Sequence, residues 1–139
     1  MLLAMSELQY REFLESGDTL RVYAGDVLVF CSQKDRLVPL LEYLERFGEG
    51  RAVVMMDKMV GNAAALLMIR AGCGEVYSPL GSKLAVETLG KWGVACHFDK
   101  VVAYISRADG VGMCPMEEMS VGKSPEEFLA ALVARDSQP

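Results

Sequence analysis

The spacing of hydrophobic and polar residues divides the chain into helical and extended segments. Apolar side chains recur every three or four residues at 2–15, 37–47 and 82–92, among polar and charged residues. The segment 37–47 is the clearest case of an amphipathic surface helix. A further helix is predicted at 124–135, because the Ser-Pro-Glu-Glu sequence starting at Ser124 is a capping box with proline at the first helical position.

Short apolar runs predict the strands. The segment 19–31 contains two of them around Ala24-Gly25-Asp26, which is the pattern of a β-hairpin with a tight glycine turn. A continuous apolar run at 52–56 is typical of a strand buried on both faces, and further strands are expected at 75–78 and 95–106. The alternation of strands and helices favours a three-layer α/β/α sandwich with a mixed, mainly parallel sheet and an N-terminal β-hairpin.

One segment is apolar on almost every side. Within residues 59–71 only Asn62 and Arg70 are polar, whereas a surface helix has one apolar stripe and one polar face. We therefore expect a central helix that packs between other layers. Asp57 is suited to act as its N-cap, and Gly72 is suited to end it in a left-handed turn.

The start of this helix is a candidate anion site. Lys58 and Asn62 are four residues apart, so they are expected on one face of the first turn, beside the Asp57 carboxylate. A helix N-terminus offers unpaired N–H donors and the positive end of the helix dipole, which suit a phosphate. The alternative is that Asp57 is only a cap and that Lys58 extends into solvent.

Composition narrows the class of protein. The chain has 139 residues, 52% of them hydrophobic and 24% charged, as expected for one globular domain over residues 1–139. Its net charge of -5 comes without a basic stripe, so no nucleic-acid partner is expected. The longest apolar run, 63–69, is too short to span a membrane, and Glu7 follows the first methionines too soon for a signal peptide. Four cysteines occur singly, without a C-x-x-C pair, which favours reduced thiols in the cytoplasm.

Three segments carry a resemblance to a known family. They are RLVPLLEYLE at 36–45, DKMVGNAAALL at 57–67 and VVAYISRADGVGMCPMEEM at 101–119. On these segments the chain resembles a small family of uncharacterised bacterial and archaeal proteins that are grouped by fold with the cytidine deaminases. The resemblance implies a cytidine deaminase-like domain with its site at the N-termini of two central helices.

The same resemblance argues against deaminase chemistry. Working deaminases have an H-x-E or C-x-E motif and a later P-C-x-x-C motif, which together hold a zinc ion and supply a glutamate that transfers protons. Here Asp57 takes the first ligand position and Met59 the position of that glutamate, while Cys114 and Glu117 take the two later cysteine positions. Since methionine cannot carry a proton, no cytidine deamination is expected.

A second candidate cation precedes a glycine-rich segment. Arg107 lies just before residues 110–112, where backbone N–H donors can approach a ligand closely. A planar guanidinium beside such donors suits a phosphate or a carboxylate. A surface ion pair between Arg107 and Asp109 is the alternative, although the resemblance places this segment at the same end of the sheet as Asp57 and Lys58.

These observations predict a domain that binds a nucleotide-type small molecule, such as ADP, ADP-ribose or NAD. The expected ligand-binding residues are Asp57, Lys58, Asn62, Arg107, Cys114 and Glu117. No cofactor and no bound metal are expected. Deaminase relatives are often oligomers, so the resemblance also allows a homo-oligomer.

Two other functions stay open at this point. The chain can be an enzyme, either a metal-assisted hydrolase whose ligands are Asp57, Cys114 and Glu117, or a covalent catalyst whose nucleophile is Lys58 or Cys114. It can also be an interaction protein with a vestigial pocket. In that case Cys114 packs as a small apolar residue, and Glu117 only interacts favourably with the positive end of the dipole of a short helix.

Overall fold

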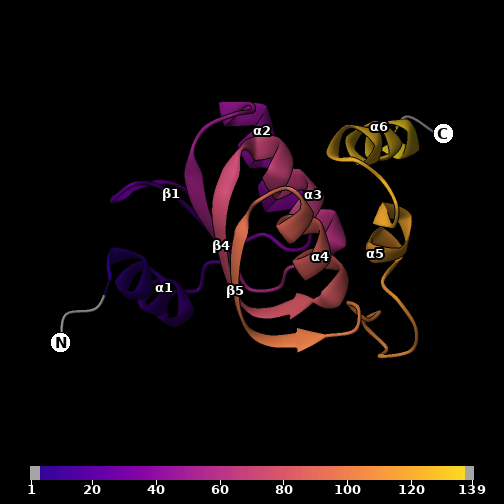
Figure 1. Cartoon of the computed structure of the whole chain (residues 1–139), viewed down its shortest axis with the longest axis horizontal. Coiled ribbons are helices and arrows are strands. Elements are labelled where there is room, and N and C mark those ends of the chain that lie inside the picture. Colours follow the sequence, from indigo (N-terminus) through magenta and orange to yellow (C-terminus); the bar gives the residue numbers. More distant parts are fainter. Residues whose placement is uncertain (1–3, 137–139) are drawn as a thin grey trace.

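Strands of one mixed sheet form the centre of the computed structural model, which describes residues 4–136 (Figure 1). The strands are β1 (Leu20–Ala24), β2 (Val27–Ser32), β3 (Val53–Asp57), β4 (Cys73–Ser82) and β5 (Ala95–Val102), in the spatial order β2-β1-β3-β4-β5. β1 is antiparallel to β2 and to β3, whereas β3 is parallel to β4 and β4 to β5. The strands β2, β3, β4 and β5 therefore run in one direction, and their C-terminal ends share one edge, which we call the carboxyl edge.

The predicted hairpin is confirmed, but the sheet is evenly mixed and not mainly parallel. The first hairpin strand, β1, lies between β2 and β3, so two of the strand pairings are antiparallel and two are parallel. Spacing in the sequence identifies strands, but it does not show which hairpin strand joins the rest of the sheet.

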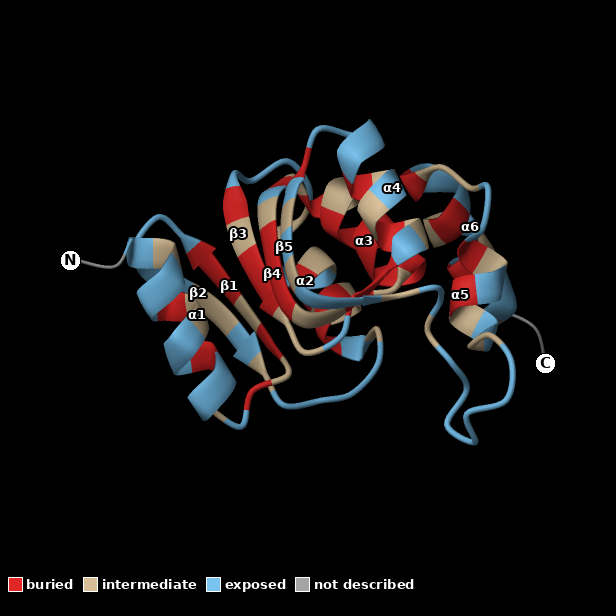
Figure 2. Ribbon diagram, turned by 60° about the horizontal axis from the view of Figure 1, so that its bottom comes forward, coloured by how far each residue is buried: buried red, intermediate tan, exposed pale blue. Residues whose placement is uncertain are grey.

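Helices lie on both faces of the sheet. They are α1 (Met5–Glu15), α2 (Val38–Phe47), α3 (Asn62–Ala71), α4 (Lys83–Lys91), α5 (Pro115–Ser120) and α6 (Pro125–Asp136). α1 covers one face, α2, α3 and α4 lie on the other, and α5 and α6 pack on α3 on the side away from the sheet (Figures 1 and 2). The helices predicted at 37–47, 82–92 and 124–135 are confirmed, whereas residues 2 and 3 of the first predicted helix lie outside the described residues. None of the described helices combines the length and hydropathy needed to cross a membrane.

The prediction of a central helix is confirmed by α3, which lies in the red interior of Figure 2. Eight of its ten residues are buried, from Asn62 to Met68 and at Ala71. The side chains of Leu66, Leu67 and Met68 are almost completely removed from water, and each such burial contributes about 1.5–3 kcal/mol. Gly72 ends the helix with a φ of 89°, as predicted.

The start of this helix differs from the prediction. α3 begins at Asn62, its N-cap is Gly61, and Asp57 is the last residue of β3. The backbone N–H of Val60 donates to the Leu80 carbonyl (2.9 Å), and Val60 forms a parallel bridge with Gly81. Because this pairing keeps the chain extended after Asp57, the helix starts later, and the prediction that Asp57 is its N-cap is wrong.

The segment after β5 also differs. β5 ends at Val102, whereas the apolar pattern predicted a strand to Ser106. The chain then folds back on itself, with a bridge between Ser106 and Met113 and a 2.7 Å hydrogen bond from the Cys114 N–H to the Ile105 carbonyl. Residues 103–114 therefore form a closed loop between the sheet and α5.

Candidate functional site

A buried carboxylate lies at the N-terminus of α3. Glu117, on α5, is 2% exposed. Its Oε1 accepts the N–H of Asn62, and its Oε2 accepts the N–H of Ile105 at 2.6 Å. Gly61 leaves room for this group, since a Cβ there would lie 3.1–3.2 Å from both carboxylate oxygens. Because the N-terminal turn of α3 contains no acidic residue and no side-chain cap, Glu117 is an anion that caps the helix from another element.

The Asn62 side chain completes a polar cluster between three helices. Its Nδ2 donates to the Ser120 carbonyl (3.2 Å) and to the Ser120 hydroxyl (3.0 Å), and its Oδ1 accepts a hydrogen bond from Thr88. The Ser82 hydroxyl, at the start of α4, lies 3.5 Å from Oε1 of Glu117. The amide of Asn62 thus joins α3 to α4 and α5, and its hydrogen-bonding capacity is used inside the protein.

At the start of α3 the structure has a protein carboxylate in place of the predicted ligand anion. The carboxylate of Glu117 occupies the position at the start of α3 that the sequence assigned to a phosphate. The Lys58 ammonium lies elsewhere, 4.8 Å from the centre of the Phe13 ring and 3.5 Å from the Leu14 carbonyl. Lys58 precedes the helix, so the prediction that Lys58 and Asn62 share one helical face is wrong.

Asp57 ends β3 at the carboxyl edge. Its Oδ1 accepts the N–H of Met59 at 3.3 Å. The residue is half-buried, and desolvation raises the pKa of its carboxyl group from 3.8 to about 7, against the opposing effect of the Met59 and Lys58 backbone donors. Asp57 therefore changes its charge near neutral pH.

The three residues proposed as metal ligands are not brought together. Cys114 is the half-buried N-cap of α5, and Glu117 is directed to the start of α3. Within residues 4–136, no group of three or more His, Cys, Asp or Glu side chains could hold a metal ion. Since α3 starts at Asn62, Asp57 and Met59 do not lie at the helix start at which the resemblance places the deaminase motif.

The glycine-rich segment is a closed turn in which the N–H donors of Gly110 and Val111 are already used. The Gly110 N–H donates to the Arg107 carbonyl (2.9 Å), and the Val111 N–H donates to Oδ1 of Asp109 (2.9 Å). The Arg107 side chain is exposed, and its Nε donates to the Met113 carbonyl (3.3 Å). The guanidinium remains accessible, but two of the predicted backbone donors are hydrogen-bonded within the loop and are not free to bind a ligand.

One feature of the carboxyl edge was not predicted from the sequence. The loops that follow β2, β3 and β5 leave the sheet at this edge and carry Arg36, Lys58 and Arg107, respectively. β2 and β5 are the two outermost strands, so these cations are spread along the edge. Arg36 has a φ of 62°, in the left-handed region that non-glycine residues rarely adopt. Such strain is concentrated at functional sites. The sequence could have indicated it only through the charged run after β2, because the direction of β2 relative to β3 depends on sheet order.

Comparisons with known proteins agree on one family. No curated protein matches the chain. A solved structure, that of a DUF1893 family protein (TM1506) from Thermotoga maritima, is 24% identical and has a TM-score of 0.86, with 97% of this chain and 92% of that chain covered. At this identity the likeness shows a shared fold. Residues 9–134 match the family TM1506, a domain of unknown function (DUF1893). The chain therefore belongs to this uncharacterised family, the domain of unknown function DUF1893.

Proposed function

We propose that the chain is a single domain that binds a phosphate-bearing, nucleotide-type small molecule at the carboxyl edge of its sheet. The observation that carries this proposal is that the loops bearing Arg36, Lys58 and Arg107 all leave the sheet at that edge, in a protein of net charge -5. Open α/β sheets bind their ligands beyond the carboxyl ends of their strands. A strained arginine supports the same location, because the backbone is held in an unfavourable conformation there.

The proposal includes a cytidine deaminase-like fold without zinc chemistry. In such a fold the zinc ligands lie at the starts of two helices, and here the starts of α3 and α5 are joined by the Glu117 carboxylate. An internal anion in this position supports loss of the metal, since it neutralises the helix N-terminus without a bound ion. The free thiols of the described cysteines support a cytoplasmic location.

An enzymatic role is the second candidate, and Asp57 is the observation that favours it. A carboxyl group whose pKa is about 7 can both donate and accept a proton at neutral pH. Its position at the carboxyl edge would place it against the same ligand. In this version Asp57 is the acid or base, and Lys58, the next residue, is the cation that holds the substrate phosphate.

Calorimetric titration with ADP, ADP-ribose, NAD and inorganic phosphate tests the proposal. The variants Arg36→Ala, Lys58→Ala and Arg107→Ala should each lose a charge-assisted contact worth roughly 1.5–3 kcal/mol, or about ten-fold to a hundred-fold in affinity. Lys91→Ala is the matched control, because Lys91 is an exposed cation at the far end of α4. Product analysis after incubation with each nucleotide separates simple binding from catalysis.

Two results would contradict the proposal. If none of the nucleotides binds the wild type, the carboxyl edge is not a site for this class of ligand. If a nucleotide binds but the three edge variants behave like Lys91→Ala, the ligand lies elsewhere on the protein.

Loss of turnover in Asp57→Asn with binding retained would favour the enzyme over the binding domain.

A further inference from the structure

The outer edge of β2 carries no charged residue. β2 pairs with β1, and within residues 4–136 no strand pairs with its other side. Its sequence, VLVFCS, contains no charge and no proline. At the opposite edge of the sheet β5 carries His97, Asp99 and Lys100. Charges, prolines and bulges are the usual protection of an edge strand against pairing. β5 carries charges, whereas β2 has neither charge nor proline and is interrupted only by one bulge.

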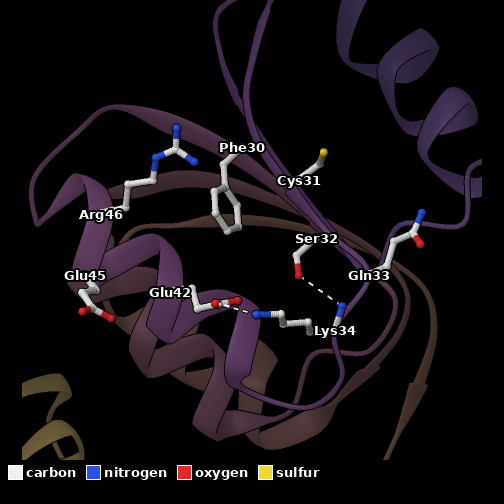
Figure 3. A pocket seen from close by; sticks show the side chains of 8 residues that line it. All are labelled: Phe30, Cys31, Ser32, Gln33, Lys34, Glu42, Glu45 and Arg46. Carbon is white, nitrogen blue, oxygen red and sulfur yellow. Dashed lines mark hydrogen bonds and ion pairs between the residues drawn. The ribbon is translucent and has the colours of Figure 1, made fainter.

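The surface around β2 is open and partly apolar. Val27 is 57% exposed and Leu28 is 40% exposed. An open hollow of about 790 Å³ lies between β2 and α2, and the ring of Phe30 and the side chain of Arg46 border it (Figure 3). A bulge at Val29, where Val22 pairs with Phe30 and Tyr23 with Leu28, leaves the two ends of β2 as the segments available for pairing.

The charges at the ends of β2 are self-complementary. Asp26 immediately precedes the strand, and Lys34 lies two residues after it. Within one copy the Lys34 ammonium also pairs with the Glu42 carboxylate of α2 at 2.8 Å, on an exposed surface (Figure 3). When two copies of β2 lie antiparallel, the Asp26 end of each strand lies beside the Lys34 end of the other, so the same favourable contact forms twice. The rim of the hollow also has both signs of charge, with Glu45 and Arg46 from α2 (Figure 3). A two-fold interface requires a surface that complements itself in this way.

We propose that a second copy of this chain pairs antiparallel along the outer edge of β2. The product is a two-fold dimer with a continuous ten-stranded sheet, made of the five strands of each copy. The α2 helices of the two copies then flank the joined strands and cover the hollows beside Phe30. Backbone hydrogen bonds hold the strands together, and the end charges fix their antiparallel alignment. This inference is independent of ligand binding at the carboxyl edge.

Sedimentation equilibrium and native mass spectrometry test the dimer directly. The wild type should be a dimer, and Cys31→Lys should dissociate it because a charge is placed on the exposed pairing edge. Val101→Lys is the matched control, since Val101 is 46% exposed on the other edge strand, β5. A monomeric wild type, or a control that dissociates while Cys31→Lys remains dimeric, overturns the proposal.

A charge swap tests the alignment and does not depend on Cys31. Asp26→Lys and Lys34→Asp each place like charges side by side, so each should raise the dimer dissociation constant about ten-fold or more. The triple variant Asp26→Lys/Lys34→Asp/Glu42→Gln exchanges the charges, removes the carboxylate that pairs with Lys34 within one copy, and should restore the dimer. Failure of the triple variant to recover, with folding verified by circular dichroism and with Glu42→Gln alone still dimeric, overturns the antiparallel β2 pairing. Wild-type monomers that bind an added extended peptide along β2 would indicate a different partner and also overturn it.

Discussion

The carboxylate of Glu117, on α5, accepts the backbone N–H of Asn62, the first residue of α3, from 55 positions away in the sequence. This hydrogen bond supplies the cap that α3 lacks in its own sequence. The second carboxylate oxygen holds the N–H of Ile105. One side chain thus fixes the start of the central helix and the base of the loop at residues 103–114.

Removal of this carboxylate should destabilise the fold. Glu117→Ala leaves the buried N–H of Asn62 and the part-buried N–H of Ile105 without a partner, and we expect a loss of about 3 kcal/mol in the free energy of unfolding. Glu117→Gln keeps the shape but replaces one acceptor oxygen by a donor, so its loss should be intermediate. Urea denaturation provides the measurement. Glu118→Ala, at the exposed neighbouring residue, should change stability by less than about 0.5 kcal/mol; equal losses at both positions would show that Glu117 is no cap.

Asp57 should make stability depend on pH. Its folded pKa, about 7, lies above the unfolded value of 3.8, so the folded state holds the proton more tightly. Its contribution to stability is therefore fully present below about pH 4 and is lost as the pH rises through 7. Asp57→Asn cannot ionise, and it should exceed the wild type in stability by about 1–2 kcal/mol above pH 7, after allowance for the solvent contact of a half-buried side chain.

The check is a series of urea unfolding curves between pH 4 and pH 8.5. The difference between Asp57→Asn and the wild type should grow across this range. A difference that stays constant with pH would mean that the Asp57 carboxyl ionises normally in the folded protein.

Arg36 should show a conflict between stability and binding. Its φ of 62° suits glycine and strains an arginine, so Arg36→Gly is expected to stabilise the free protein by up to about 1 kcal/mol. The same variant lacks the guanidinium and should bind the nucleotide more weakly than the wild type does. Thermal unfolding without and with ligand measures both effects. A variant that is stabilised and still binds normally would leave Arg36 without a role in recognition.

Two glycines should respond in opposite ways to the same substitution. A Cβ at Gly81, on β4, would lie 2.1 Å from the Phe98 ring, so Gly81→Ala should cost about 1–3 kcal/mol as the ring is displaced. A Cβ at Gly90, on α4, meets no atom within 4 Å, and Gly90→Ala should stabilise the helix by about 0.5–1 kcal/mol. Chemical denaturation of both variants checks the packing of β4 against β5; a neutral Gly81→Ala would contradict it.

The sequence by itself determined the features that depend on neighbouring residues. The capping box of α6 is formed as predicted, since the Ser124 N–H donates to Glu127 Oε1 at 2.9 Å and the Glu127 N–H donates to the Ser124 hydroxyl at 3.1 Å. The hairpin at residues 19–31, the left-handed end of α3 at Gly72 and the burial of α3 are confirmed for the same reason. Hydrophobic spacing and turn chemistry act over a few residues, so the sequence shows them directly.

Only the tertiary structure decided how the candidate site is built. A β-bridge between Val60 and Gly81 delays the start of α3, and Asn62 finds its partners at Thr88 and Ser120, 26 and 58 residues away. Glu117 therefore reaches the helix start that was predicted for a phosphate, while Lys58 lies against Phe13. The physical reason is that a hydrogen-bond donor or a charge takes whichever partner the packed chain brings near it. That choice depends on strand order and helix packing, which the local pattern of residues does not contain.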